Sequence, residues 1–222
     1  MAPGALYEVP VKTILGEDKP FGDFARGKVT LVVNTASACG LTPQYAGLED
    51  LYQRYSSRGF TVIGFPCNQC VFVAWRRARR LGAFAQNAPA CARDAARRRP
   101  RRRGASSACL LCSSPHLPPR ASPFDRFGGQ APGDSATEQN FACTKYKTTF
   151  QMMAKVYVNG DKEAPLWKAL KDAKGSMLGR NIKWNFAKFL IARDGTVIER
   201  YLPTTSPASI AGDIEKLLGA SA

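Results

Sequence analysis

The first half of the chain alternates short apolar runs with one segment of helical periodicity. Residues 29–34 and 60–65 are β-branched and apolar, which is typical of buried central strands. Between them, tyrosines and leucines recur at the spacing of one helix face. Thr42 is expected to cap this helix with Pro43 at its first position, and Gly59 marks its end. The order strand, loop, helix, strand predicts a βαβ crossover.

The second half starts with helical signals and ends with antiparallel ones. Asp134 or Ser135 is expected to cap a helix that runs toward Cys143, and the Asp194-Gly195 pair is a strong hairpin turn signal. A parallel unit followed by a hairpin predicts an α/β fold with a mixed central sheet flanked by helices. The other expected elements are strands at 6–15 and 155–158, a helix at 164–173, hairpin strands at 186–192 and 196–201, and a closing helix at 206–218.

Residues 70–126 break this pattern. These 57 residues contain 13 Arg and no Lys, with Asp94 and Asp125 as the only acids, so they carry +11 of the net charge of +15. Weak hydrophobic patterning with many Arg and Pro predicts disorder. We therefore expect one domain made of residues 1–69 and 127–222, interrupted by an Arg/Ala/Pro-rich insertion at 70–126.

Three interpretations of the insertion compete. The arginine run at 97–103 could neutralise nucleic-acid phosphates, but no aromatic residues interleave with it. The pairs Cys67/Cys70 and Cys109/Cys112 have the C-x-x-C spacing of zinc ligands, although the gap between them is longer than usual. The third interpretation, a translated intron or gene-model error, is favoured because GC-rich noncoding sequence encodes Arg, Ala, Pro and Gly. We accordingly expect no specific nucleic-acid partner and no metal.

The cysteine count and the start of the chain bear on its compartment. Seven Cys is an odd number without a compact framework, which argues against a secreted disulfide scaffold. The first residues lack a basic region followed by an apolar one, and the apolar runs are shorter than a membrane span. These features predict a soluble cytoplasmic protein, with an organelle as the alternative.

Cys39 is a candidate reactive residue because it lies just before the predicted helix N-terminus. The helix dipole and the free backbone N–H groups there favour a thiolate. Such a thiolate can attack a peroxide oxygen and become a sulfenic acid. Spacing alone leaves open the alternative of a buried, inert cysteine.

Four segments of the chain resemble motifs of the glutathione peroxidase family. They are residues 34–42 around Cys39, residues 64–69 (Gly-Phe-Pro-Cys-Asn-Gln), their apparent continuation at 127–130 (Phe-Gly-Gly-Gln), and residues 184–190 (Trp-Asn-Phe-Ala-Lys-Phe-Leu). Removing 70–126 joins the second and third segments into one motif. The resemblance covers residues 5–219 apart from the insertion. It implies a thioredoxin-like fold and, in the response to oxidative stress, reduction of hydrogen peroxide and organic or lipid hydroperoxides.

The same resemblance implies roles for individual residues. Cys39 would be the peroxidatic nucleophile, and Gln69, Trp184 and Asn185 would complete the catalytic site, with no prosthetic cofactor. Amide and indole N–H groups can stabilise a thiolate and donate to the leaving oxygen. Taken singly, Trp184 would be read as a core aromatic and Asn185 as a turn residue. Cys67 is interpreted as structural.

Cys143 lies in a segment, residues 141–146, that resembles the resolving-cysteine region of the plant, yeast and protozoan branch of the family. In that branch the second thiol attacks the sulfenic acid, and thioredoxin or a similar dithiol protein reduces the resulting intramolecular disulfide. The resemblance thus implies a thioredoxin-dependent peroxidase rather than a strict glutathione user, with a thioredoxin-type protein or glutathione as co-substrate. The short stretch between Ala173 and Trp184 resembles the monomeric branch that accepts bulky lipid hydroperoxides.

Alternatives to this interpretation remain open. Cys143 could be an inert helix cysteine. The same residues could serve a thiol redox relay or peroxide sensor, in which oxidised Cys39 passes its disulfide to a partner. The chain could also be an Arg-rich nucleic-acid-binding protein built on an inactive peroxidase scaffold.

Overall fold

The computed structural model describes residues 4–69, 129–176 and 179–219. The chain divides into two units, Met1–Val71 with Pro123–Ala222, and Phe72–Ser122. The second unit, and with it the insertion expected at 70–126, lies outside the described residues.

A five-stranded sheet with strand order β5-β4-β3-β6-β7 forms the centre of the described fold. Strands β3 (Val29–Thr35) and β4 (Phe60–Pro66) are parallel, and every residue of both is buried. Burial on both faces explains why these two strands read as continuous apolar runs. The neighbours are β5 (Gln151–Met152), parallel to β4, and β6 (Lys188–Ile191) and β7 (Val197–Tyr201), which form an antiparallel hairpin beside β3.

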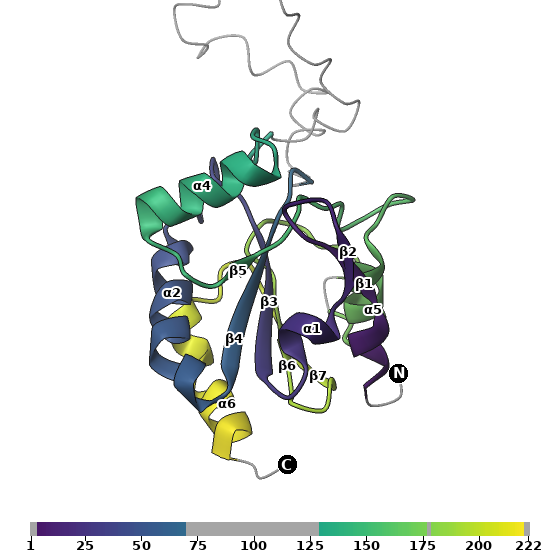
Figure 1. Cartoon of the computed structure of the whole chain (residues 1–222), viewed down its shortest axis with the longest axis vertical. Helices are drawn as coiled ribbons and strands as arrows, with labels where there is room; N and C mark the ends of the chain where they lie inside the picture. The colour runs from purple at the N-terminus through teal and green to yellow at the C-terminus, as the bar shows by residue number, and fades with distance from the viewer. Residues whose placement is uncertain (1–3, 70–128, 177–178, 220–222) are drawn as a thin grey trace, which may run out of the picture. The chain divides into compact units, whose positions relative to one another are not determined.

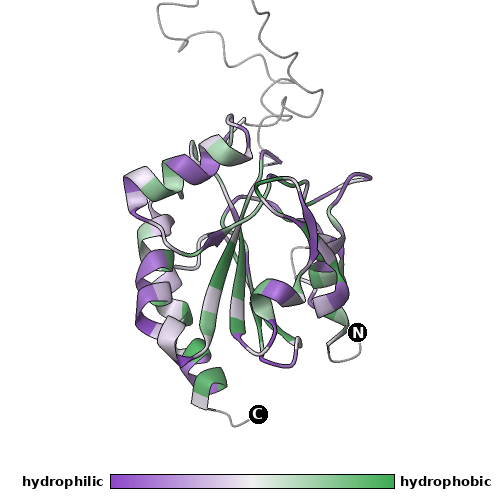
Figure 2. Cartoon of the chain, in the orientation of Figure 1, coloured by the Kyte–Doolittle hydropathy of each residue, from purple (hydrophilic) through white to green (hydrophobic). Residues whose placement is uncertain are grey.

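Helices cover both faces of the sheet. In Figure 1, α2 (Gln44–Tyr55) and α6 (Pro207–Gly219) lie on one side, whereas α1 (Gly22–Ala25) and α5 (Pro165–Ala173) lie on the other. Because side chains alternate along a strand, Leu31 and Val33 join the core beneath α2, and Val32 joins the core beneath α5. The green strands between two-coloured helices in Figure 2 follow this division. The mixed sheet expected from the sequence is confirmed.

Helix α4 (Ser135–Tyr146) begins where the sequence predicted. Asp134 caps it by accepting a hydrogen bond from Thr137 N at 2.8 Å, and Lys147 ends it in the left-handed region with φ of 56°. The helix packs beside the start of α2, where Tyr146 stacks on Tyr45 with ring centroids 5.4 Å apart. The segment that carries Cys143 is therefore anchored next to the βαβ crossover.

Two expected strands are corrected by the structure. The expected strand at 6–15 is a 3-10 helix (Ala5–Glu8) followed by a hairpin of β1 (Pro10–Lys12) and β2 (Asp18–Pro20), because Gly16, with φ of 86°, turns the chain. Residues 155–158 form no strand. Their Val156 N does bond Pro66 O at 2.9 Å, but Val158 N is taken by a side-chain oxygen of Gln69 instead of a ladder partner.

Candidate active site

Cys39 lies in the turn between β3 and α2, at the end of the sheet where parallel strands deliver functional loops. Its side chain is buried, with 7% of the residue exposed, and its sulfur accepts a hydrogen bond from Leu41 N at 3.4 Å. An N–H aimed at sulfur stabilises negative charge there. The local geometry is therefore that of a sheltered thiol with a backbone donor.

Thr42 shapes this turn, in a way that differs from its predicted role as a helix cap. Its Oγ1 accepts from Cys39 N at 3.0 Å and lies 2.6 Å from Cys39 O and 2.9 Å from Ala36 O, the two carbonyls to which it can donate. Helix α2 then starts at Gln44 with no side-chain cap. The hydroxyl is used to close the loop around the cysteine, which leaves the first turn of α2 uncapped by this side chain.

Asn34, near the end of β3, holds the segment that contains Trp184 and Asn185. Its Nδ2 donates to Trp184 O at 3.2 Å and to Asn185 Oδ1 at 3.3 Å, and its Oδ1 accepts from Ala187 N at 2.9 Å. Asn185 is completely buried, and Trp184 packs against the same core as Cys39. The structure thus brings the Cys39 loop and the Trp184-Asn185 pair to one end of the sheet.

Phe186 follows this pair in a strained conformation. Its φ of 66° lies in the left-handed region, which a bulky residue adopts at an energetic cost. The conformation is held by a hydrogen bond from Phe186 N to Asn34 O at 2.6 Å. The Phe186 ring also makes an edge-on contact with the Tyr45 ring, with centroids 5.5 Å apart. The strained residue lies directly after Asn185, in the segment that Asn34 holds.

Gln130 is a site residue that the sequence interpretation missed. Asn185 Nδ2 donates to Gln130 Oε1 at 3.1 Å, and Ala38 N, next to Cys39, donates to Gln130 O at 2.7 Å. Both Gln69 and Gln130 belong to the motif that the insertion divides. The sequence therefore contains two candidates for the side-chain amide near Cys39. The signal was present in the Phe-Gly-Gly-Gln continuation, but position along the chain does not reveal which amide faces Asn185.

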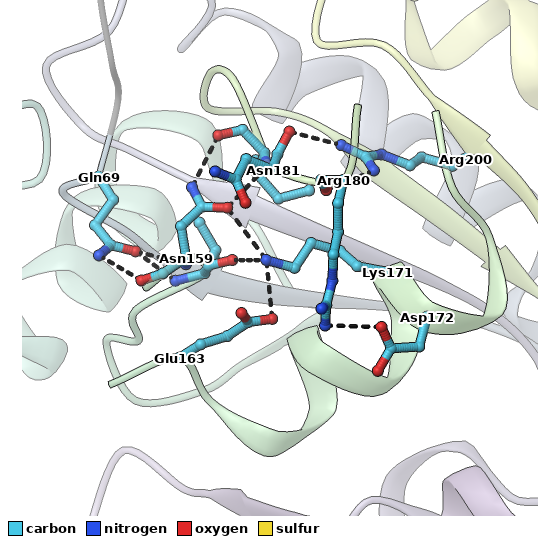
Figure 3. Close-up of polar contacts among 10 residues, drawn as sticks. Gln69, Asn159, Glu163, Lys171, Asp172, Arg180, Asn181 and Arg200 are labelled. Carbon is cyan, nitrogen blue, oxygen red and sulfur yellow. Dashed lines mark hydrogen bonds and ion pairs between the residues drawn. The ribbon is translucent and has the colours of Figure 1, made fainter. Parts of the chain in front are cut away.

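Gln69 lies in a different network. Its Oε1 accepts from Val158 N at 2.6 Å and from Asn159 N at 2.9 Å, and its Nε2 donates to Asn159 O at 2.9 Å. Figure 3 shows this amide hydrogen-bonded to the backbone of Asn159, beside Lys171 and Glu163. All three of these contacts fix the backbone of the turn. The structure does not bring Gln69 together with Asn185.

Cys143 is exposed on α4, and its sulfur lies 3.9 Å from Thr148 Oγ1. It is a free thiol, as are Cys39 and Cys67; the other four cysteines lie outside the described residues. Cys67 is completely buried in the core beneath α5, and burial raises the pKa of its thiol to about 11. Of these three thiols, Cys39 and Cys143 are the pair on the α2 side of the sheet.

Two buried ionisable groups next to the site were not anticipated. Glu138 on α4 is 1% exposed and accepts hydrogen bonds from Ser37, and burial raises the pKa of its carboxyl. Lys188 donates to Gln44 Oε1 at 2.5 Å and to Phe186 O at 2.8 Å, and burial lowers its pKa to about 8. Neither residue has a sequence signal, because each depends on contacts between distant segments.

Within residues 4–69, 129–176 and 179–219, no cluster of three or more His, Cys, Asp or Glu side chains could hold a metal ion. The C-x-x-C partners of Cys67 in the zinc hypothesis lie outside these ranges. A search of the same described segments finds no helix long and apolar enough to span a membrane.

Comparison with known sequences points to one family. Residues 6–87 and 120–171 match the sequence model of the family described as Glutathione peroxidase. The chain is 37% identical over 221 residues to the probable phospholipid hydroperoxide glutathione peroxidase 6, mitochondrial, of Arabidopsis thaliana, covering 99% of this chain and 70% of that protein. It is also 37% identical to a probable phospholipid hydroperoxide glutathione peroxidase of Mesembryanthemum crystallinum, over 99% of this chain and 95% of that one.

Solved structures agree on the fold. The crystal structure of Trgpx in apo form matches with a TM-score of 0.61 and 30% identity over 99% of this chain and 98% of that one. T. cruzi GPX1 matches with a TM-score of 0.57 and 27% identity over 97% of each chain. A thioredoxin family thiol:disulfide interchange protein from Chlorobium tepidum, at 12% identity and a TM-score of 0.53 over 99% of each chain, shows the thioredoxin-like fold alone.

Proposed function

Because the chain belongs to the glutathione peroxidase family and is a hydroperoxide-reducing peroxidase, we propose that Cys39 is the nucleophile of this reaction. Its thiolate attacks one peroxide oxygen, an S–O bond forms and the O–O bond breaks. The departing oxygen takes up a proton and leaves as water or an alcohol, and Cys39 becomes a sulfenic acid. The observation that carries this assignment is the Leu41 N–H aimed at the Cys39 sulfur in the turn before α2.

Gln130, Asn185 and Trp184 are the groups proposed to stabilise the charge that moves during this step. Asn185 is locked by Asn34 and bonds Gln130, while the backbone of Gln130 bonds the residue before Cys39. Amide and indole donors fixed beforehand stabilise a developing oxyanion without reorganising. We assign the amide role to Gln130 instead of Gln69, because the Gln69 amide is occupied by the 158–159 backbone.

Cys143 is proposed to resolve the sulfenic acid. Its thiolate attacks the oxidised sulfur of Cys39, the S–O bond breaks, and hydroxide leaves as water after taking up a proton, which produces an intramolecular disulfide. Thioredoxin or a similar dithiol protein would then reduce that disulfide. Support comes from the exposure of the Cys143 thiol and from its place on a helix that packs beside α2.

The substrates proposed are hydrogen peroxide and organic or lipid hydroperoxides, reduced by a monomer as part of the response to oxidative stress. The names of the two plant relatives specify phospholipid hydroperoxides, and the chain is similar to both over nearly its whole length. The Arabidopsis relative carries a mitochondrial designation, so an organelle stays beside the cytoplasm as an expected location.

Steady-state peroxide consumption tests the proposal. Wild type, Cys39→Ser, Cys143→Ser and, as a buried-thiol control, Cys67→Ala are each assayed with thioredoxin and with glutathione. We expect Cys39→Ser to abolish consumption and Cys143→Ser to abolish only the part driven by thioredoxin. Thioredoxin-driven turnover that survives in Cys143→Ser would contradict the resolving role. A wild type that oxidises once but does not turn over would favour the relay.

A further inference from the structure

A buried carboxylate ties the helix that carries Cys143 to the loop that carries Cys39. Glu138 Oε2 accepts from Ser37 N at 3.2 Å, and its Oε1 accepts from Ser37 Oγ at 2.9 Å and from Gly133 N at 3.1 Å. Ser37 is two residues before Cys39, and Glu138 is five residues before Cys143 on the same helix. One side chain thus links the two proposed redox centres through short segments of chain.

As an ionised carboxylate, Glu138 offers both oxygens as acceptors for these bonds, which come from neutral N–H and O–H groups. The neighbouring cation, Lys155, donates instead to Ala131 O at 2.5 Å and to Gly133 O at 3.0 Å, so it steadies the turn before α4. Hydrogen bonds to an ionised acceptor are about twice as strong as neutral ones. The link between α4 and Ser37 is therefore stronger than a contact between neutral side chains would be.

Helix geometry directs Glu138 and Cys143 to different sides of α4. Residues five apart on an α-helix point about 140° away from each other around the axis. An intact α4 that directs Glu138 inward to Ser37 consequently directs Cys143 elsewhere, and Glu138 is indeed buried while Cys143 is exposed. If α4 turns or partly unwinds to bring Cys143 to Cys39, the bonds between Glu138 and Ser37 break.

We propose that Glu138 is a positioning residue that latches α4 onto the Cys39 loop, holding the loop in its peroxide-reactive form and restraining resolution until the latch opens. This inference rests on the proposed roles of Cys39 and Cys143. With the latch closed, Ser37 is held by Glu138 and Ala38 by Gln130, so the loop is fixed on both sides just before the nucleophile. With the latch open, Cys143 is released toward the sulfenic acid.

The two steps can be measured separately in the Glu138→Gln variant. Oxidation of Cys39 by hydrogen peroxide is followed in a Cys143→Ser background, and disulfide formation after one equivalent of peroxide is followed by quenching and mass spectrometry with Cys143 present. The glutamine keeps the size of Glu138 but turns one acceptor into a donor. We expect oxidation to slow by about tenfold, because charge-assisted bonds to the loop are lost, and disulfide formation to accelerate severalfold.

Glu49→Gln is the matched control. Glu49 also accepts from a backbone N–H and a hydroxyl of one residue, Thr149, at 2.8 and 2.6 Å, but it joins α2 to the chain after α4 and does not touch the Cys39 loop. Both rates should stay at the wild-type values in this variant. A purely structural role for Glu138 would instead lower the melting temperature and leave the ratio of the two rates unchanged.

Ser37→Ala removes the hydroxyl half of the latch from the other side and leaves the buried acid in place. It should shift both rates in the same directions as Glu138→Gln, by smaller factors, and it decides the question if Glu138→Gln does not fold. An unchanged ratio of the two rates in the variants that fold overturns the latch. Wild-type protein whose Cys39 does not react with peroxide would instead overturn the proposed function on which the latch depends.

Discussion

Two regions of the molecule, around Gln69 and around Gln130, use the same kind of side chain differently. At the first, the Gln69 amide bonds three backbone groups of the 158–159 turn. At the second, the Gln130 amide accepts from Asn185, and its backbone bonds the residue before Cys39. The first region is a structural anchor, whereas the second orients side chains around Cys39, the proposed nucleophile.

Each region also contains a buried lysine, and the difference between the two is instructive. Lys171, beside Gln69, forms an ion pair with Glu163 at 2.9 Å and donates to Val158 O at 2.7 Å. Lys188, beside Asn185, has neutral oxygen acceptors, and burial lowers its pKa to about 8. In the anchor region, the charge of Lys171 is balanced by a carboxylate. In the site region, the buried Lys188 has only neutral acceptors, and the backbone of Phe186 is strained.

The largest effect expected from this comparison is on stability in Lys171→Met. Removing this buried cation leaves the Glu163 carboxylate, whose side chain is 12% exposed, and the Val158 carbonyl without their partner. The loss should lower the free energy of unfolding by about 3–5 kcal/mol in urea titrations. Lys174→Met is the matched control, because Lys174 makes an exposed pair with Glu199 at 3.7 Å and should cost about 1 kcal/mol or less. Equal losses of unfolding free energy in the two variants would show that the Lys171 ion pair stabilises the fold no more than an exposed pair does.

A smaller loss is expected in Gln69→Ala. Val158 N and Asn159 N lose their acceptor, which should lower the free energy of unfolding by about 1–3 kcal/mol. Gln53→Ala serves as the comparison, since Gln53 donates only to exposed groups on Glu49 and Thr149. If Gln69→Ala were as stable as Gln53→Ala, the 158–159 turn would not depend on this amide.

The last effect expected from this comparison is a pH dependence that arises from Lys188. Because its pKa falls from 10.5 to about 8 on folding, the unfolded chain binds more protons than the folded one between these values. The stability attributable to Lys188 should therefore rise with pH through this window, by at most about 1.4 kcal/mol per pH unit, and be lost as pH falls through 8. The slope should vanish in Lys188→Met and persist in Lys168→Met, where the lysine is exposed. Identical slopes in the two variants would contradict the assignment of this pH dependence to Lys188.

Much of the fold was predictable because it depends on local sequence patterns, such as apolar runs, helix caps and turn residues. The apolar runs of β3 and β4, the Asp134 cap and the hairpin around Gly195 all appear as expected. Motif order likewise pointed to Cys39, Trp184 and Asn185, which the structure brings to one end of the sheet.

The rest depends on contacts between segments far apart in the chain. Residues 155–158 looked like a strand, but the backbone N–H of Val158 bonds a side chain 89 positions away. The choice between two glutamines in one motif, and the burial of Glu138 and Lys188, are set by which distant groups approach them. Patterns along a sequence do not encode such pairings.

The central claim is that the Gln130 region, and not the Gln69 region, serves Cys39. The most direct measurement is the second-order rate constant for oxidation of Cys39 by hydrogen peroxide in Gln130→Ala and Gln69→Ala, each corrected for its folded fraction. Loss of a preorganised donor at the reacting oxygen should slow Gln130→Ala by about 10²–10³, whereas Gln69→Ala should react as wild type does. A slow Gln69→Ala beside a normal Gln130→Ala would contradict the account.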